Sequence, residues 1–295
     1  MVLCIAENIN IMSKTIGPAM KERNPKPIHD MAKKVTENGC DYLDLNIGPA
    51  RKMGVELMDW LVKTVQEVSD LPLSLDTTNL DAMEAGLKAN TSGKKLLMNS
   101  ISLQPERLEK GLPMVTRYQA DVIGLLWGKE GMPRDANERA AMAVDFIYQA
   151  NTSGIPTKDI WIDPIATPIS VDVNQVLSGL EFMSMLGEIT PEAKSTVGLS
   201  NISNGAPEHL RPYLNRTYFI MLMKYNLHSA IVDGFDTELL AIAKGKRAGH
   251  VKLVHDIMDE KEFDPALLDK TELEYYKSTR VLLGKVLYSH SWLTT

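Results

Sequence analysis

Short apolar runs alternate with longer amphipathic stretches along the chain. The runs are rich in branched and aromatic residues and predict eight strands, at 2–8, 41–47, 72–76, 95–100, 121–127, 159–163, 196–201 and 229–233. Between them, stretches such as 27–39, 53–68 and 138–150 repeat apolar positions every three or four residues, as amphipathic helices do. Strands that alternate with helices eight times predict an α/β fold, a parallel (β/α)8 TIM barrel.

The chain is predicted to form one domain, 1–295, because no linker rich in Gly, Pro or Ser divides the repeating units. Residues 247–295 extend beyond a closed barrel and are expected to add C-terminal helices. The last helical stretch begins with a capping pair, Asp269 and Glu272, and carries an apolar stripe of Leu273, Tyr276 and Leu283. We expect this helix to pack on the outside of the barrel, and a contact with a subunit or partner is the alternative.

Composition excludes several classes of protein. Hydrophobic residues make up 44% of the 295 residues and charged residues 24%, which is ordinary for a globular protein. The net charge of -6 provides no basic surface for nucleic acid or an anionic membrane. No signal-like start and no membrane-length apolar run is visible, so we expect a cytoplasmic location. The two cysteines, Cys4 and Cys40, are interpreted as buried thiols.

Polar side chains end nearly all the predicted strands. They are Glu7, Asn8, Asp44, Asn46, Asp76, Asn99, Asp163, Asn201 and Asp233, with Trp127 as the exception. In a barrel these ends converge on one mouth, where binding and catalytic residues gather. Asp and Asn also end strands because they form turns and cap the following helix, which is the structural alternative. Repetition around the barrel favours a polar pocket.

The residue types in this pocket restrict its ligand. No lysine or histidine ends a predicted strand, so neither a Schiff-base site nor a histidine-rich metal site is indicated, and we expect no bound metal. The loops after the seventh and eighth strands lack the paired glycines typical of a barrel phosphate site. Carboxylates and amides suit a ligand with several N–H donors. A pterin ring is such a ligand, because one carboxylate can accept two parallel hydrogen bonds from it.

Six ordered motifs carry a resemblance to a known family. "DYLDLNIGPA", "LPLSLDTTN", "LLMNS", "WIDPI", "VGLSNIS" and "RPYLNRTYF" resemble those of the methyltetrahydrofolate:corrinoid protein methyltransferases. These are pterin-binding barrel enzymes related to the folate domain of cobalamin-dependent methionine synthase. The likeness runs from Ala6 to about Ala243. It implies a methyltransferase of one-carbon metabolism, acting in the acetyl-CoA pathway or in O- or N-demethylation, and we expect a homodimer.

The resemblance also implies roles for individual residues. Asp76, Asn99 and Asp163 match the pterin-binding set, and Asn201 matches the amide that reaches N5 of the folate. Asn201 and Asp76 are therefore the predicted catalytic residues.

Four further residues are predicted to contact the folate, although no family motif assigns them an individual role. Glu7 and Asn46 are added to the predicted pterin set, and Arg211 and Arg216 are candidates for binding the folate tail. The family's early "G-E-R-x-N" pattern reads "AENIN" here, so Ala6 and Asn8 replace its glycine and arginine, while Glu7 and Asn10 are kept.

The implied substrates are tetrahydrofolate or 5-methyltetrahydrofolate and a corrinoid (cobalamin). A methyl group would pass between N5 and cobalt by direct displacement, with Asn201, Asp76 and ordered water sharing the approach of the proton. None of the six histidines stands in the D-x-H-x-x-G context of corrinoid-binding modules. We therefore expect the corrinoid to arrive on a separate corrinoid protein that docks at the barrel mouth.

Three alternatives remain open. Dihydropteroate synthase shares the barrel and pterin pocket, but it carries a lysine and then a serine-arginine pair at the seventh strand, where this chain has "GLSNISN". A non-catalytic scaffold resembling the small subunit of the corrinoid iron-sulfur protein is the second alternative, and folate binding would discriminate it. An unrelated small-molecule lyase on the same barrel is the third.

Overall fold

The computed structural model describes residues 1–50 and 52–294. Within them, eight strands form one sheet: β1 (Leu3–Asn10), β2 (Tyr42–Asn46), β3 (Leu73–Asp76), β4 (Leu97–Ser102), β5 (Asp121–Leu125), β6 (Ile160–Asp163), β7 (Lys194–Ser195) and β8 (Ser229–Val232). Neighbouring strands pair in parallel, in the order β7-β6-β5-β4-β3-β2-β1-β8. The predicted barrel is confirmed, and it is nearly closed.

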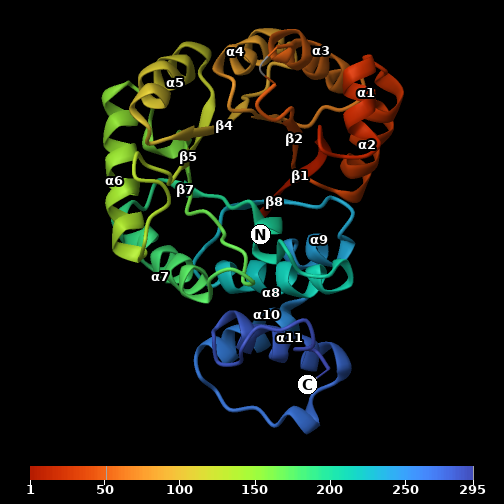
Figure 1. Cartoon of the computed structure of the whole chain (residues 1–295), viewed down its shortest axis with the longest axis vertical. Helices are drawn as coiled ribbons and strands as arrows, with labels where there is room; N and C mark the ends of the chain where they lie inside the picture. Colours follow the sequence, from red (N-terminus) through yellow and green to blue (C-terminus); the bar gives the residue numbers. More distant parts are fainter. Residues whose placement is uncertain (51, 295) are drawn as a thin grey trace.

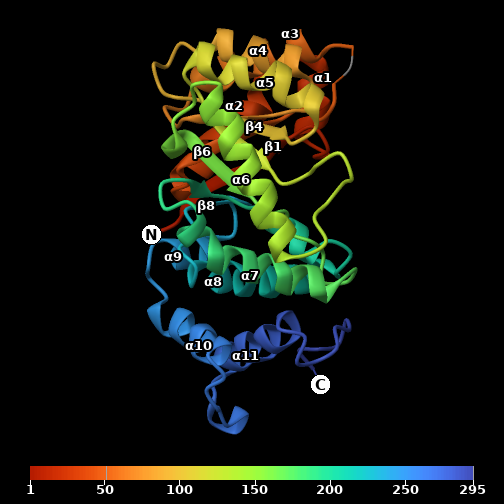
Figure 2. The same ribbon diagram turned by 90° about the vertical axis from the view of Figure 1, so that its left-hand side faces the viewer.

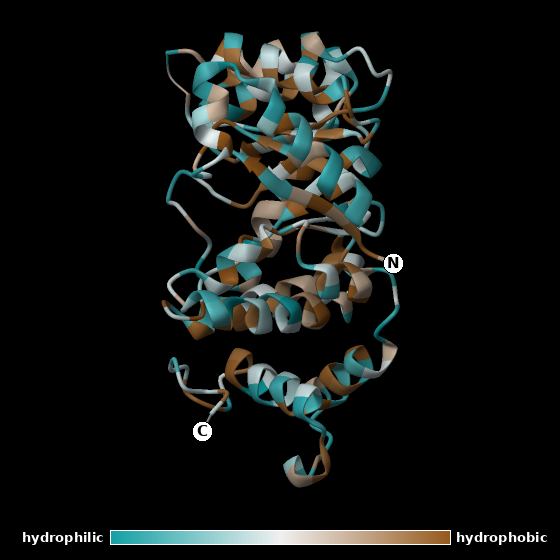
Figure 3. Ribbon diagram, turned by 90° about the vertical axis from the view of Figure 1, so that its right-hand side faces the viewer, coloured by the Kyte–Doolittle hydropathy of each residue, from teal (hydrophilic) through white to brown (hydrophobic). Residues whose placement is uncertain are grey.

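Helices surround the strands (Figure 1). They are α1 (Ile16–Glu22), α2 (Pro25–Asn38), α3 (Gly54–Gln66), α4 (Leu80–Ala89), α5 (Pro105–Tyr118), α6 (Ala136–Thr152), α7 (Val173–Ile189), α8 (Arg211–Met223) and α9 (Thr237–Ala243), followed by α10 (Ala248–Met258) and α11 (Lys270–Leu282). Most of the apolar core lies between the strands and this ring of helices. Figure 3 shows the strands as mainly hydrophobic and the outer helices as mixed, which matches helices with one buried face.

The seventh strand differs from its predicted range, 196–201. β7 covers only Lys194 and Ser195, and the chain then makes a single parallel bridge between Gly198 and Ile231 of β8. The amide of Ile231 donates to the Val197 carbonyl at 2.8 Å, so this segment leaves β6 to close the barrel against β8. It turns at once into the 3-10 helix η2 (Leu199–Ser203), which leaves no length for a regular strand.

Three other boundaries shift by two residues at the mouth. β1 continues to Asn10 and β4 to Ser102, beyond the predicted ends at 8 and 100. β5 ends at Leu125, so Trp127 lies in the following loop, where 41% of it is exposed.

The C-terminal helices pack outside the barrel, against α8 (Figures 1 and 2). The capping box of Asp269 and Glu272 is confirmed. Of the predicted apolar stripe, Tyr276 and Leu283 are half-buried and pack against the core, and Leu273 is half-buried as well. The fully buried residues of α11 are Tyr275, Ser278, Thr279, Val281 and Leu282. Ser278 accepts a hydrogen bond from Trp292 Nε1 at 3.1 Å, so the chain end packs on this face.

The interior of the barrel contains its own small apolar cluster. Ile5, Leu97, Ile123, Trp161 and Ile231 come from five different strands and form a cluster separate from the main core. Because side chains alternate across a strand, residues two positions further along each strand face the same interior, one layer nearer the mouth. That layer contains Glu7, Asn99, Asp163 and Asp233.

Charged and aromatic side chains fill the opposite, N-terminal end of the barrel. Asp121 accepts a hydrogen bond from Trp161 Nε1 at 2.9 Å and pairs with Lys95 at 2.6 Å and Lys194 at 3.2 Å. Lys194 Nζ lies 4.9 Å from the Trp161 ring centre, and His228 packs edge-on against the same ring. Burial lowers the pKa of His228 to about 4. This end is therefore packed with paired charges and rings.

Among residues 1–50 and 52–294, no helix is both long enough and apolar enough to cross a lipid bilayer.

Two glycines provide a matched test of the packing. A Cβ at Gly124 of β5 would lie 2.6 Å from the ring of Phe146 on α6, whereas one at Gly187 of α7 would meet nothing within 4 Å. We expect Gly124→Ala to lower the free energy of unfolding by ~1–3 kcal/mol through overpacking. Gly187→Ala should raise it by about 0.5–1 kcal/mol because alanine favours a helix. Urea unfolding of the three proteins measures both changes, and equal stabilities would contradict the packing described here.

Candidate functional site

Strand register places four polar side chains side by side at the mouth. Asn10 of β1 is the cross-strand neighbour of Asn46 on β2, Asn46 is the neighbour of Asp76 on β3, and Asp76 is the neighbour of Asn99 on β4. Adjacent strands lie about 4.8 Å apart, so these positions form a continuous row across four strands. The row contains three of the predicted pterin-binding residues, Asn46, Asp76 and Asn99.

Helix capping does not explain these strand-end residues. The following helices are capped by other side chains further along each loop, including Asn79 before α4, Asp135 before α6 and Asp172 before α7. Asp76 and Asp163 therefore do not cap the helices that follow them. Asp163 and Asp233 do form turns, because each Oδ1 accepts from the amide two positions along the chain, Ile165 at 2.8 Å and Phe235 at 2.9 Å.

Asp76 is held between a donor and a second carboxylate. Asn46 Nδ2 donates to Asp76 Oδ2, while Asn46 Oδ1 accepts from the Gly48 amide at 3.0 Å. Burial, and then the negative charge of Asp44, raise the pKa of Asp76 well above its ordinary value, although the Asn46 hydrogen bond opposes the shift. Asp76 can therefore exist as an acid or as a carboxylate, depending on what binds beside it.

Asp44, predicted among the strand-end residues of the pocket but given no role of its own, is buried below this row. Its Oδ1 accepts from Ser74 Oγ at 2.6 Å and from Asn99 Nδ2 at 3.1 Å. Burial raises the pKa of Asp44 to about 6. The bond to Asp44 fixes the amide of Asn99, so Asp44 orients a predicted ligand residue. The two-residue spacing of Asp44 and Asn46 within one strand is the signal in the sequence for this role.

Asp163 ends β6 and is buried. Its Oδ1 accepts from the Ile165 amide at 2.8 Å, and the Gly198 amide also donates to the carboxyl group. Burial raises the pKa of Asp163 to about 6 despite these two bonds.

Glu7 connects β1 to the segment that carries Asn201. Ser200 Oγ donates to Glu7 Oε1 at 2.5 Å. Burial is the main cause that raises the pKa of Glu7 to about 7, with Asp233 and Asp44 adding to the rise and Arg211 opposing it. Asn201 follows Ser200 on η2 and is exposed at the mouth. Its Oδ1 accepts from Asn204 Nδ2 at 3.2 Å, which leaves the Asn201 amide nitrogen as a donor.

The two arginines predicted for the folate tail line one cavity. Arg211 and Arg216 border a space of about 630 Å³ together with Glu7, Asn8 and Asp233. Arg211 donates to Ser203 Oγ at 3.0 Å and to the Ser200 carbonyl at 3.3 Å, and Arg216 Nε donates to both oxygens of Asp236 at 2.9 Å. Both cations are thus engaged within the protein, and their role in tail binding stays a prediction.

Asn8 stands where the resembling family has an arginine. Its Nδ2 donates to Asp233 Oδ1 at 2.7 Å and its Oδ1 accepts from the Gly234 amide at 2.8 Å. In this chain the position therefore ties β1 to the end of β8.

The mouth as a whole offers carboxylate and amide acceptors and few free cations. The described part of the chain contains no group of three or more His, Cys, Asp or Glu side chains arranged to hold a metal ion. Such a surface suits a flat ligand with several N–H donors.

Comparisons with known proteins agree with this chemistry. The sequence pattern of the family described as "Pterin binding enzyme" matches residues 9–218. A methylcorrinoid:tetrahydrofolate methyltransferase from Eubacterium limosum is 24% identical over 241 residues, which cover 81% of this chain and 88% of the relative. A methionine synthase from Mycobacterium leprae (strain TN) is 29% identical over 276 residues, covering 90% of this chain but 23% of that longer protein.

Solved structures share the fold. A dihydropteroate synthase from Thermus thermophilus superposes with a TM-score of 0.63 at 17% identity, covering 84% of this chain and 94% of that one. The Yersinia pestis enzyme, solved with a pterine-sulfa conjugate, has a TM-score of 0.63 at 15% identity, with the same two shares of chain covered. At these identities the likeness concerns the fold alone.

Removal of the buried charge at Asp163 should change how stability depends on pH. The folded protein binds this proton more tightly than the unfolded chain, so the benefit to stability is complete below about pH 4 and is lost as the pH rises through about 6. Asp163→Asn should therefore stabilise the protein by up to about 3 kcal/mol near pH 8 and by much less near pH 4. Denaturant unfolding at both pH values measures this difference. Asp145→Asn, on the exposed face of α6, is the control, and a gain that is independent of pH would contradict the expectation.

Proposed function

The chain belongs to the pterin-binding enzyme family, and from this premise we propose that it transfers a methyl group between N5 of tetrahydrofolate and the cobalt of a corrinoid carried by a separate protein. The observation that carries the proposal is the set of acceptors formed by Asp76, Asn99 and Asp163 around one mouth. The E. limosum relative, whose name states methylcorrinoid and tetrahydrofolate, supports it.

The pterin ring would lie against the row of polar side chains on β1 to β4, which we call the acceptor row, with Asp163 beside it. A carboxylate of Asp76 or Asp163 can accept paired hydrogen bonds from a ring N–H and the exocyclic amino group, while Asn99 supplies an amide oxygen. Each charge-assisted bond contributes about 1.5–3 kcal/mol. Binding of these donors lowers the pKa of the buried carboxylates, because the ligand stabilises their charged form.

Asn201 would act at N5. The N5 amine is a poor leaving group, so the bond to the methyl group breaks readily only if N5 gains positive character through a hydrogen bond or a proton. The Asn201 amide nitrogen is free to donate, because Asn204 satisfies the oxygen. The glycine at position 198 leaves space for this amide, because a Cβ at that position would lie only 3.1 Å from Asn201 Nδ2. Asp76 and ordered water would supply the proton in the same pocket.

The corrinoid would come from a partner protein and meet the folate at the open mouth. When the methyl group moves to cobalt, N5 keeps the electron pair of the broken bond and takes a proton, and the reverse transfer returns that proton. The predicted homodimer and cytoplasmic location remain predictions beside this proposal.

Dihydropteroate synthase is favoured less, although its solved structures share the fold. The lysine near the seventh strand of this chain, Lys194, lies at the N-terminal end of the barrel, where it pairs with Asp121 at 3.2 Å. The mouth end of the same segment is Gly198 followed by η2, with no lysine.

Two substitutions test binding and chemistry separately. Asp76→Ala should weaken tetrahydrofolate binding at least about a hundredfold, because two charge-assisted bonds are lost. Asn201→Ala should slow methyl transfer roughly a hundredfold while leaving most of the binding intact. An anaerobic single-turnover assay with (6S)-methyltetrahydrofolate and cob(I)alamin, with a parallel binding titration, measures both, and Asp145→Ala is the control. Unchanged transfer by Asn201→Ala would refute its role at N5, and absence of folate binding by the unaltered protein would favour the scaffold alternative.

Folate affinity should also depend on pH. Burial raises the pKa of Asp163 to about 6, and the protonated acid accepts fewer hydrogen bonds than the carboxylate. Affinity for tetrahydrofolate should therefore rise about tenfold between pH 5 and pH 7, where the group ionises. Asp163→Asn should bind more weakly and lose this dependence. Anaerobic titrations across the range measure the effect, and a flat profile for the unaltered protein would exclude Asp163 as the ionising ligand.

A further inference from the structure

A buried arginine on α6 lies beside the mouth without touching the acceptor row. We propose that Arg139 is a positioning residue that fixes the side of the mouth carrying Asp163 and Asn201, and so sets the affinity for folate. The effect on affinity rests on the proposed function, whereas the anchoring of the mouth loops does not.

Arg139 is a cation buried without a carboxylate partner. Its exposed fraction is 0%, and no ion pair joins it to an acidic side chain in the residues that the structure describes. Burial lowers the pKa of its guanidinium. A buried charge without an opposite charge is costly, so its hydrogen bonds must all be well made for the residue to be tolerated.

The guanidinium group connects three segments. Nε donates to the Pro164 carbonyl at 3.0 Å, directly after Asp163. Nη1 donates to Ser178 Oγ at 2.6 Å, and Nη2 donates to Gln175 Oε1 at 2.7 Å, both on α7. One planar group thus links α6, α7 and the start of the loop 164–172.

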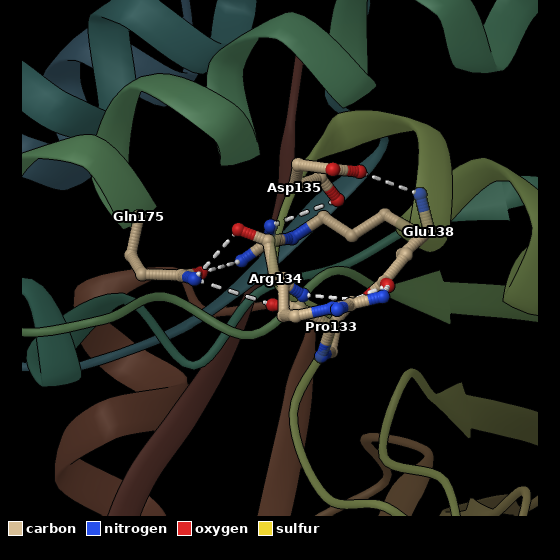
Figure 4. Close-up of polar contacts among 6 residues, drawn as sticks. Pro133, Arg134, Asp135, Glu138 and Gln175 are labelled. Carbon is tan, nitrogen blue, oxygen red and sulfur yellow. Dashed lines mark hydrogen bonds and ion pairs between the residues drawn. The ribbon is translucent and has the colours of Figure 1, made fainter.

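Gln175 extends this connection to the loop between β5 and α6, residues 126–135. Its Nε2 donates to the Arg134 carbonyl at 3.0 Å and the Pro133 carbonyl at 3.3 Å, as Figure 4 shows. The side chain of Arg134 is turned to Glu138 and takes no part in the anchor (Figure 4). Arg139 and Gln175 therefore hold two adjacent mouth loops from below.

The loop 164–172 in turn holds the segment that carries Asn201. The Ile169 amide donates to the Ile202 carbonyl at 3.0 Å, and Ser170 Oγ donates to the Asn204 carbonyl at 2.9 Å. These acceptors follow Asn201 by one and three positions in the chain. Movement of the loop would displace Asn201 and Asp163 together.

Lysine cannot replace this group. The guanidinium presents five N–H donors in a fixed plane, whereas an ammonium is a compact point charge on a flexible stem. Arg139→Lys keeps the charge but cannot reach Pro164, Ser178 and Gln175 together. A displacement of about 1 Å at a site of this kind is enough to cost a large factor in binding or rate.

The experiment compares three variants with the unaltered chain. Arg139→Lys removes the planar anchor. Gln175→Ala removes the link to the loop 126–135 together with the acceptor of Arg139 Nη2, but it keeps the arginine and its bonds to Pro164 and Ser178. Arg134→Gln changes an exposed arginine on that loop and serves as control. Each is studied at a temperature where circular dichroism shows it folded. Acrylamide quenching of Trp127, obtained by difference from Trp127→Phe, reports the loop, and anaerobic titration with tetrahydrofolate reports the site.

We expect Arg139→Lys to increase quenching of Trp127 and to weaken folate binding roughly tenfold or more, with Gln175→Ala showing the same changes to a smaller extent. Arg134→Gln should remain within about twofold of the unaltered chain. A merely structural role would lower the melting temperature and leave the affinity and quenching of the folded variants unchanged, which would overturn the proposal.

Two further outcomes are decisive. If Arg139→Lys does not fold, Gln175→Ala decides, since it spares the buried cation. If the unaltered protein fails to bind folate, the proposed function is refuted, whereas Trp127 quenching still tests the anchoring of the loops.

Discussion

The parallel hydrogen-bond register of the barrel is the constraint on which the rest of the structure depends. It brings side chains from four successive strands into one row, although Asn10, Asn46, Asp76 and Asn99 are far apart in the sequence. A slip of one residue in any strand would turn its polar side chain towards the helices and an apolar one into the mouth. The apolar cluster inside the barrel, one layer below, opposes such a slip, because a one-residue shift of a strand would remove its apolar side chain from the cluster.

Burial then determines the chemistry of these side chains. Glu7, Asp44 and Asp163 have pKa values raised to about 7, 6 and 6, in each case mainly through loss of contact with water. Carboxyl groups of this kind can change protonation near neutral pH, whereas solvated ones cannot. The protein thus tolerates destabilising acids at the mouth, where a ligand with N–H donors would relieve the cost, as is usual for functional sites.

Sequence patterns predicted the barrel and the strand-end residues because both follow from local periodicity and chain order. The predicted range of the seventh strand was wrong because the pairing of this segment changes from β6 to β8 at Val197. That change depends on closure of the barrel and leaves no local signal in the sequence. The apolar stripe of α11 did not include its most buried positions, because the small residues Ser278 and Thr279 are buried there and their polarity predicts exposure. Arg139 was missed for the same reason, since a charged residue on an amphipathic helix is normally solvated.

The packed N-terminal end has a kinetic consequence. Among the described residues, Asp121, Trp161 and the two lysines fill that end, which leaves the mouth as the open end of the barrel interior. Under the proposed function, the small substrate and the protein that carries the second reactant would share this one entrance. The catalytic cycle would then be ordered, with the small molecule entering before the larger partner docks and leaving after it withdraws.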